Sequence, residues 1–164
     1  PVEVADRTVP GLWEGDLLMG RRQASALGTL VERTTRTTLL VPLRVKDATS
    51  VRRAFAREMR TLPQQLVRSL TCDRGKEMAE HRLFTETPGI QVSFAHPQSP
   101  WARGTNENTN GLLRQFFPKG TDFTTISRRQ IKHVQHLMNG RPRRVLNWQT
   151  PGEAFSQHLV ALET

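Results

Sequence analysis

The stretch Leu12–Met19, which reads Leu-Trp-Glu-Gly-Asp-Leu-Leu-Met, predicts a β-strand that carries a carboxylate among apolar residues. Side chains alternate across a strand, so Asp16 shares a face with Glu14 and Leu18, while Trp13 points to the other face. A carboxylate within a central strand costs free energy unless it is paired or bound to a metal. Asp16 is therefore a candidate site residue, and a salt bridge to one of the many arginines is the alternative.

The segments around this strand predict an α/β domain with a mixed five-stranded sheet flanked by helices. Two β-rich runs follow it across short basic turns, which indicates an antiparallel meander. Helical periodicity then alternates with short apolar runs, which indicates crossovers to parallel strands. The expected further strands are Ala26–Glu32, Thr37–Leu43, Ser69–Cys72 and Ile90–Phe94, and the expected helices are 51–62 with Asp47 or Thr49 as its cap, Lys76–Phe84, Gly104–Phe117, Gln130–Met138 and Pro151–Leu162.

The composition indicates a globular domain with a polyanionic partner. The chain has 164 residues, 36% of them hydrophobic, and a net charge of +9 that comes mostly from arginine. An arginine-biased genome would explain part of the arginine excess but not the sign of the charge. The single cysteine, Cys72, excludes an internal disulfide and fits a reducing cytosol. The absence of tyrosine excludes DNA joining through a tyrosine nucleophile.

Two further acidic residues stand where a strand ends or a helix begins. Asp73 follows the apolar run Ser69–Cys72, and Glu107 opens an amphipathic stretch. Each has an ordinary alternative, Asp73 as a helix cap and Glu107 as a first-turn acid favoured by the helix dipole. If the fold brings Asp16, Asp73 and Glu107 together, their carboxylates form an oxygen cage suited to Mg²⁺. On a basic chain, such a cage predicts an enzyme that cuts or joins nucleic acid.

A polar stripe follows from Glu107 along the predicted helix. Glu107, Asn110 and Arg114 fall on one face, opposite an apolar face. We expect Asn110 to support the metal site from the second layer of residues. Arg114, with the flanking Arg103 and Lys119, is expected to contact DNA phosphates.

Three other polar residues are weaker candidates. Glu77, four residues after Asp73, is a candidate supporting acid, although a surface pair with His81 on one helix is the more common arrangement. His133 and His136 have the spacing of a metal pair, but a solvated helix face is the preferred interpretation.

Several segments together resemble the catalytic core of bacterial insertion-sequence transposases. The longest is Ser99–Gln115, Ser-Pro-Trp-Ala-Arg-Gly-Thr-Asn-Glu-Asn-Thr-Asn-Gly-Leu-Leu-Arg-Gln; the others are Gly11–Asp16, Gly28–Arg33, Leu70–Met78, Asn139–Arg143 and Thr150–Pro151. The resemblance runs from about residue 11 to 155 and is to the insertion-sequence-thirty family, within the DDE transposases and retroviral-type integrases. Leu12 departs from the family, where a histidine is common, but it is not a triad position.

This resemblance implies a ribonuclease H-like fold whose Asp-Asp-Glu triad is Asp16, Asp73 and Glu107. It implies two Mg²⁺ ions per site, about 3.5–4 Å apart, with Asp16 as the bridging ligand and Mn²⁺ as a substitute. Water would free a 3′-OH at the transposon end, and that 3′-OH would attack target DNA. The expected DNA partners are transposon ends and target DNA, bound by a homodimer or larger synaptic complex. The expected location is the bacterial cytoplasm at the nucleoid, with no membrane association.

The domain organisation follows from the local composition and from this resemblance. Residues 1–10 are polar with a proline at each end, which indicates a linker, and residues 11–164 form the expected catalytic core. The family normally carries an N-terminal helix-turn-helix region that this sequence does not contain. We therefore expect weak recognition of specific transposon ends.

Two alternatives remain at this stage. A ribonuclease H or resolvase-type nuclease on the same fold would need the same carboxylates but no strand transfer. The Asn106–Asn108 string and the basic tail favour the transposase. A non-enzymatic DNA-binding relic would be supported by a lost carboxylate, and all three are present.

Overall fold

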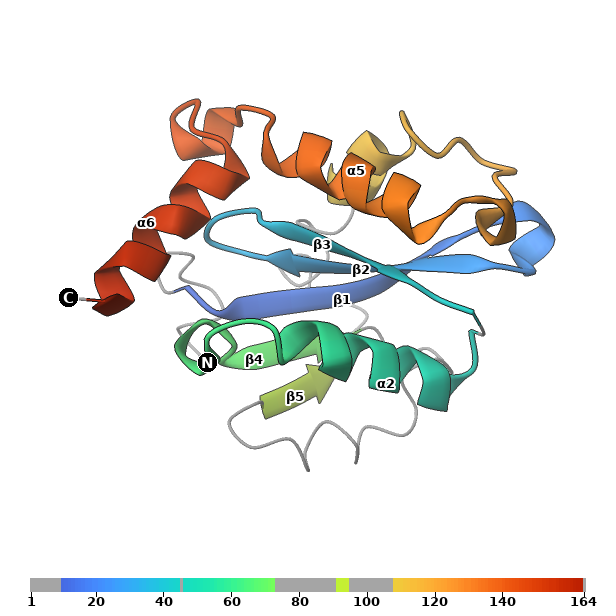
Figure 1. Cartoon of the computed structure of the whole chain (residues 1–164), viewed down its shortest axis with the longest axis horizontal. Coiled ribbons are helices and arrows are strands. Elements are labelled where there is room, and N and C mark those ends of the chain that lie inside the picture. The colour runs from blue at the N-terminus through green and yellow to red at the C-terminus, as the bar shows by residue number, and fades with distance from the viewer. Residues whose placement is uncertain (1–9, 45, 73–90, 95–107, 164) are drawn as a thin grey trace.

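The computed structural model of the chain describes residues 10–44, 46–72, 91–94 and 108–163, arranged around one mixed β-sheet (Figure 1). The strand order is β3-β2-β1-β4-β5, with β1 (Leu12–Met19) at the centre. The first three strands pair antiparallel, and β4 and β5 are added in parallel. The other strands are β2 (Ala26–Glu32), β3 (Thr38–Pro42), β4 (Ser69–Cys72) and β5 (Gln91–Phe94). The predicted meander and mixed sheet are confirmed.

Helices cover both faces of the sheet, and the alternation along the strands separates two apolar cores. In Figure 1, α2 (Ala48–Met59) lies against one face and α5 (Arg128–Asn139) against the other. Trp13 belongs to the core under α2, whereas Leu18 belongs to the core under α5. The predicted side of the strand for each residue is therefore confirmed, and Asp16 faces the same side as Leu18.

Local capping signals set where the helices begin. The side chain of Asp47 accepts a hydrogen bond from the Ser50 N–H, which confirms Asp47 as the cap of α2. Helix α5 begins two residues earlier than predicted, because Ser127 and Gln130 form a reciprocal capping box. The predicted continuation of the first helix to Leu62 is wrong, since α2 ends at Met59 ahead of Pro63.

The outer edge of β3 is covered by side chains of α5 rather than by another strand. The Asn139 amide accepts from the Thr38 N–H at 2.8 Å and donates to the Thr38 carbonyl at 2.9 Å. Gln135 accepts from the Leu40 N–H at 2.9 Å. These side chains satisfy backbone groups that an edge strand would otherwise expose to other chains.

The C-terminal helix lies at one end of the sheet (Figure 1). Helix α6 (Pro151–Glu163) follows α5, and its Phe155 ring meets Trp13 edge-on at 6.4 Å.

Residues 108–113 are helical, whereas the prediction continued to Phe117; a tighter turn ends the helix there. The predicted helix Lys76–Phe84 lies outside the described residues. None of the described helices is long and apolar enough to cross a lipid bilayer.

Candidate active site

Asp16 lies in the middle of the sheet, on the face covered by residues 108–113 and α5. It is half-buried on the central strand and pairs in register with Thr29 of β2. Its Oδ1 accepts a hydrogen bond from the Leu17 N–H at 2.8 Å. The carboxylate is thus held by its own strand, with its second oxygen directed toward the neighbouring helical segment.

Asn110 meets Asp16 from that helical segment. Its Nδ2 donates to Asp16 Oδ2 at 3.0 Å, across 94 residues of sequence. Leu113 on the same segment is fully buried in the core, which fixes the helical face toward the sheet. The predicted polar stripe therefore does bring Asn110 to Asp16.

Arg114 lies one helical turn further along and contacts the backbone at the end of β1. Its guanidinium donates to the Met19 carbonyl at 3.0 Å and to the Phe117 carbonyl at 3.4 Å. These bonds tie the helical segment to the strand that carries Asp16. Lys119, also predicted to contact DNA, is exposed.

Four of the predicted site residues, Asp73, Glu77, Arg103 and Glu107, lie outside the described residues. The described residues next to them in the chain are nonetheless informative. Cys72 ends β4 and pairs in parallel with Gly15, the residue before Asp16. Among the described residues, no three His, Cys, Asp or Glu side chains converge on one point, and Asp16 is the only described member of the expected triad.

The donor set around Asp16 fits a hard divalent cation. Besides the carboxylate, Asn110 Oδ1 is buried and has no hydrogen-bond partner within the described part of the chain. A buried amide oxygen without a partner is costly, and oxygen ligands are those that Mg²⁺ prefers. The residues present are therefore compatible with Mg²⁺ or Mn²⁺ beside Asp16.

A buried ion pair behind Asp16 was missed by sequence reasoning. Arg33 Nε and Glu14 Oε1 are 2.7 Å apart, and both side chains are almost completely buried. Glu14 lies two residues before Asp16 on the same strand face. The salt bridge to an arginine that was the alternative role for Asp16 is therefore formed by Glu14. The sequence indicated only that Glu14 shares a strand face with Asp16, and it did not identify Glu14 and Arg33 as an ion pair.

Glu32, which precedes this arginine, is a second buried acid near the same end of β1. Burial raises the pKa of the Glu32 carboxyl from 4.5 to about 7. Hydrogen bonds from the backbone of Thr34, Thr35 and Gly11 act in the opposite direction but are weaker than the desolvation. The carboxylate accepts from the Thr34 N–H at 2.6 Å and so holds the turn between β2 and β3.

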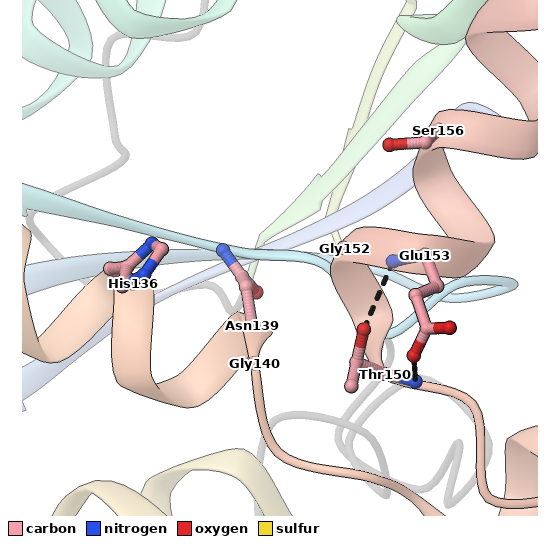
Figure 2. A pocket seen from close by; sticks show the side chains of 7 residues that line it. All are labelled: His136, Asn139, Gly140, Thr150, Gly152, Glu153 and Ser156. Atoms are coloured by element: carbon pink, nitrogen blue, oxygen red, sulfur yellow. Dashed lines mark hydrogen bonds between the residues drawn. The ribbon is translucent and has the colours of Figure 1, made fainter.

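A cavity of about 560 Å³ lies between the end of α5 and the start of α6 (Figure 2). Two of its polar side chains cap helix α6: Thr150 Oγ1 accepts from the Glu153 N–H, and Glu153 accepts from the Thr150 N–H, each at 3.0 Å. His136 lines this cavity, while His133 lies exposed on α5. The two histidines do not form a metal site with other described His, Cys, Asp or Glu residues.

Comparison with known sequences finds an integrase core domain and similar transposases. Residues 6–100 match the family described as integrase core domain. A transposase for insertion sequence element IS1086 from Cupriavidus metallidurans is 46% identical over 160 residues, which cover 98% of this chain and 47% of that protein. Transposase InsI for IS30A from Escherichia coli is 47% identical over 157 residues, 96% of this chain and 41% of that protein. The chain spans less than half the length of either relative.

Comparison with solved structures shows the same fold at low sequence identity. The catalytic core domain of BIV integrase superposes with a TM-score of 0.70 at 15% identity, over 94% of this chain and 99% of that chain. A chain of the simian T-cell lymphotropic virus intasome, solved in complex with PP2A regulatory subunit B56 gamma, superposes with a TM-score of 0.61 at 17% identity. The match covers 80% of this chain and 49% of that chain.

Proposed function

The chain belongs to the integrase core domain family, and on that premise we propose that it is the catalytic core of an insertion-sequence transposase with a ribonuclease H-like fold. The proposed reaction is cleavage of a DNA strand and transfer of the resulting 3′-OH to target DNA. The proposed triad is Asp16, Asp73 and Glu107. The relatives that are 46–47% identical to this chain are transposases, which supports transposase activity over the nuclease activity of other proteins with this fold.

The observation that carries the proposal is the contact between Asp16 and Asn110. It joins the central strand to the helical segment that follows Glu107 by only a few residues. The parallel pair of Gly15 with Cys72 supports the inclusion of Asp73, because Asp16 directly follows Gly15 in the sequence and Asp73 directly follows Cys72. Three carboxylates from neighbouring elements are what a divalent-metal phosphoryl-transfer site needs.

Within this site, the described residues hold and orient the carboxylate. The Leu17 N–H and the Asn110 amide each engage one oxygen of Asp16, which fixes the plane of the carboxylate. Asn110 keeps its Oδ1 for a further partner. We propose two Mg²⁺ ions, replaceable by Mn²⁺, held by the triad. When bound, such ions activate the attacking oxygen and offset charge on the scissile phosphate.

We propose transposon-end and target DNA as substrates, in a homodimer or larger complex that brings two ends together. The intasome formed by one structural relative supports a multimeric assembly. Lys119, Arg103 and the remaining donors of Arg114 are the proposed phosphate contacts, and Glu77 is a proposed supporting acid. We propose that this strand cleavage and transfer takes place at the nucleoid of a bacterial cell.

The test is a nicking and joining assay with Asp16→Asn. The amide keeps the shape of the side chain but removes the charge that holds metal, so nicking with Mg²⁺ or Mn²⁺ is expected to fall below detection. Asp47→Asn is the matched control, because asparagine caps a helix as well as aspartate does and the site is exposed.

Joining separates the transposase from a nuclease of the same fold. A labelled oligonucleotide with a 3′-OH end should become covalently attached to plasmid DNA, whereas a nuclease would only release fragments. Nicking by Asp16→Asn at the wild-type rate would contradict the assigned site. Nicking without joining would favour the nuclease.

A further inference from the structure

The loop between α5 and α6 exposes a tryptophan on the surface. The side chain of Trp148 is 67% exposed and that of Val145, in the same loop, is 66% exposed, whereas Trp13 is fully buried in the core. Single exposed aliphatic side chains such as Val145 are common on protein surfaces, whereas a tryptophan this exposed in an ordered loop is unusual and indicates a contact surface. Nothing in the proposed chemistry at Asp16 uses this loop.

The loop is a closed structure that holds Trp148 by its backbone. The Arg143 N–H donates to the Gln149 carbonyl at 2.9 Å, and the Trp148 N–H donates to the Arg143 carbonyl at 2.8 Å. The buried Arg143 side chain donates to the Met138 carbonyl at 3.1 Å and so anchors the loop to the end of α5. Trp148 is therefore presented on a fixed scaffold, which lowers the entropy lost when it binds a partner.

The backbone at the exposed position is in an unfavourable conformation. Asn147 has φ +52° and Trp148 has φ +68°, both in the left-handed region. Asparagine tolerates this region, but a bulky aromatic residue rarely adopts it. A strained residue whose side chain gains nothing from burial suggests that the strain is kept for function.

The charge around the loop favours a polyanion. Residues 123–152 contain six arginines and lysines and no aspartate or glutamate, so this segment carries +6 of the net +9. Arg144 is exposed within the loop. Arg141 connects the loop to the turn that follows the helical segment of the site, because its guanidinium lies 3.3 Å from Gln115 Oε1 and 5.8 Å from the centre of the Phe116 ring.

We propose that this loop binds DNA, with the Trp148 ring stacked on an unpaired base and Arg144 in contact with adjacent phosphates. Bases in an intact duplex cover one another's faces, so a flat aromatic ring gains most from single-stranded or unstacked DNA. Cationic side chains beside the ring add sequence-independent affinity. The inference rests on the proposed function in that DNA is the ligand, and it adds a preference for unpaired strands.

The experiment measures binding of the 164-residue chain to two labelled probes, a single-stranded oligonucleotide and the blunt duplex of the same sequence. EDTA is present so that no strand is cut. Trp148→Ala should weaken binding to the single strand roughly 5- to 150-fold, which corresponds to about 1–3 kcal/mol per stacked base, and leave duplex binding unchanged. Trp148→Phe should retain most of the affinity, and Trp148→Leu should behave like the alanine variant.

Two further variants complete the design. Val145→Ala removes an equally exposed apolar group from the same loop and should change neither affinity. Arg144→Ala should weaken both probes and reduce the slope of log affinity against log salt by about 0.7 to 0.9, the value for one phosphate contact. Thermal melts check that each variant is folded.

Three outcomes would overturn the proposal: no loss with Trp148→Ala, an equal loss on both probes, or a loss with Val145→Ala of the same size. A change in solution mass with Trp148→Ala at unchanged DNA affinity would instead assign the loop to contacts between copies of the chain. The nicking assay on the same variants is independent of this result. Loss of single-strand preference therefore leaves the Asp16 site untouched, and failure of nicking in the wild type leaves the loop result standing.

Discussion

Breaking the buried ion pair between Glu14 and Arg33 should destabilise the domain strongly. The two charged atoms are 2.7 Å apart, and the side chains are 0% and 1% exposed. At an effective dielectric constant of about 20, the direct attraction at this distance is about 6 kcal/mol, and the desolvation of both groups offsets much of it. The net value of the pair is therefore small compared with the cost of losing one partner.

Arg33→Met removes from the buried Glu14 carboxylate the guanidinium that lies 2.7 Å from it. The expected loss in the free energy of unfolding is about 3–5 kcal/mol, against a typical total of about 5–15 kcal/mol for a domain. The double variant Glu14→Leu with Arg33→Met removes both charges and should regain most of that loss. Urea unfolding followed by circular dichroism gives the four free energies of the double-mutant cycle.

The control for this cycle is Arg53→Met on the exposed surface of α2, which should change stability by less than about 0.5 kcal/mol. Strictly additive effects of the two single variants would refute the reasoning. So would a loss below about 1 kcal/mol for Arg33→Met. Either result would mean that water or another group compensates Glu14 when the arginine is removed.

Two further predictions concern stability. Because burial raises the pKa of Glu32 from 4.5 to about 7, its contribution to the free energy of unfolding is complete below pH 4.5 and falls by about 3 kcal/mol as the pH rises through 7. Glu32→Gln mimics the protonated acid, so it should flatten this part of the curve of stability against pH. Urea unfolding at a series of pH values measures the curve, and an unchanged slope in the variant would contradict the prediction. Asn139→Leu removes both hydrogen bonds to Thr38 at 2.8 and 2.9 Å, so it should cost about 1–3 kcal/mol and lower the melting temperature, whereas a variant as stable as the wild type would show that water replaces the amide at this edge.

Local sequence signals were sufficient for most of the fold. The strands Leu12–Met19, Ala26–Glu32 and Ser69–Cys72 have the predicted bounds, because alternation and turn residues act over a few positions. The prediction placed the start of α5 at Gln130, although Ser127 with Gln130 is a local capping-box pattern that marks a start at Arg128. The early end of the helix at residue 113 was not visible, because it depends on the turn that follows.

Long-range polar contacts were beyond the sequence. Arg33 follows Glu14 by 19 residues and Asn139 follows Thr38 by 101, and no period or motif links either pair. With 24 arginines and lysines in the chain, many cations were plausible partners for any buried acid. Which one is chosen depends on strand register and on the crossing of α5 over β3, and both are tertiary properties.

The residues that contact Asp16 bear on its proposed role. A cation beside a carboxylate offsets its charge, whereas a neutral amide such as Asn110 orients it and leaves the charge to attract metal. The structure places the buried Arg33 on Glu14, two residues away, and places the Asn110 amide at 3.0 Å from Asp16. The strand therefore holds two acids on one face with different described contacts: Glu14 is in an ion pair with Arg33, and Asp16 accepts hydrogen bonds from the Leu17 N–H and the Asn110 amide. The amide contact, which orients the carboxylate without adding charge, supports the metal-binding role proposed for Asp16 more directly than its position in a strand does.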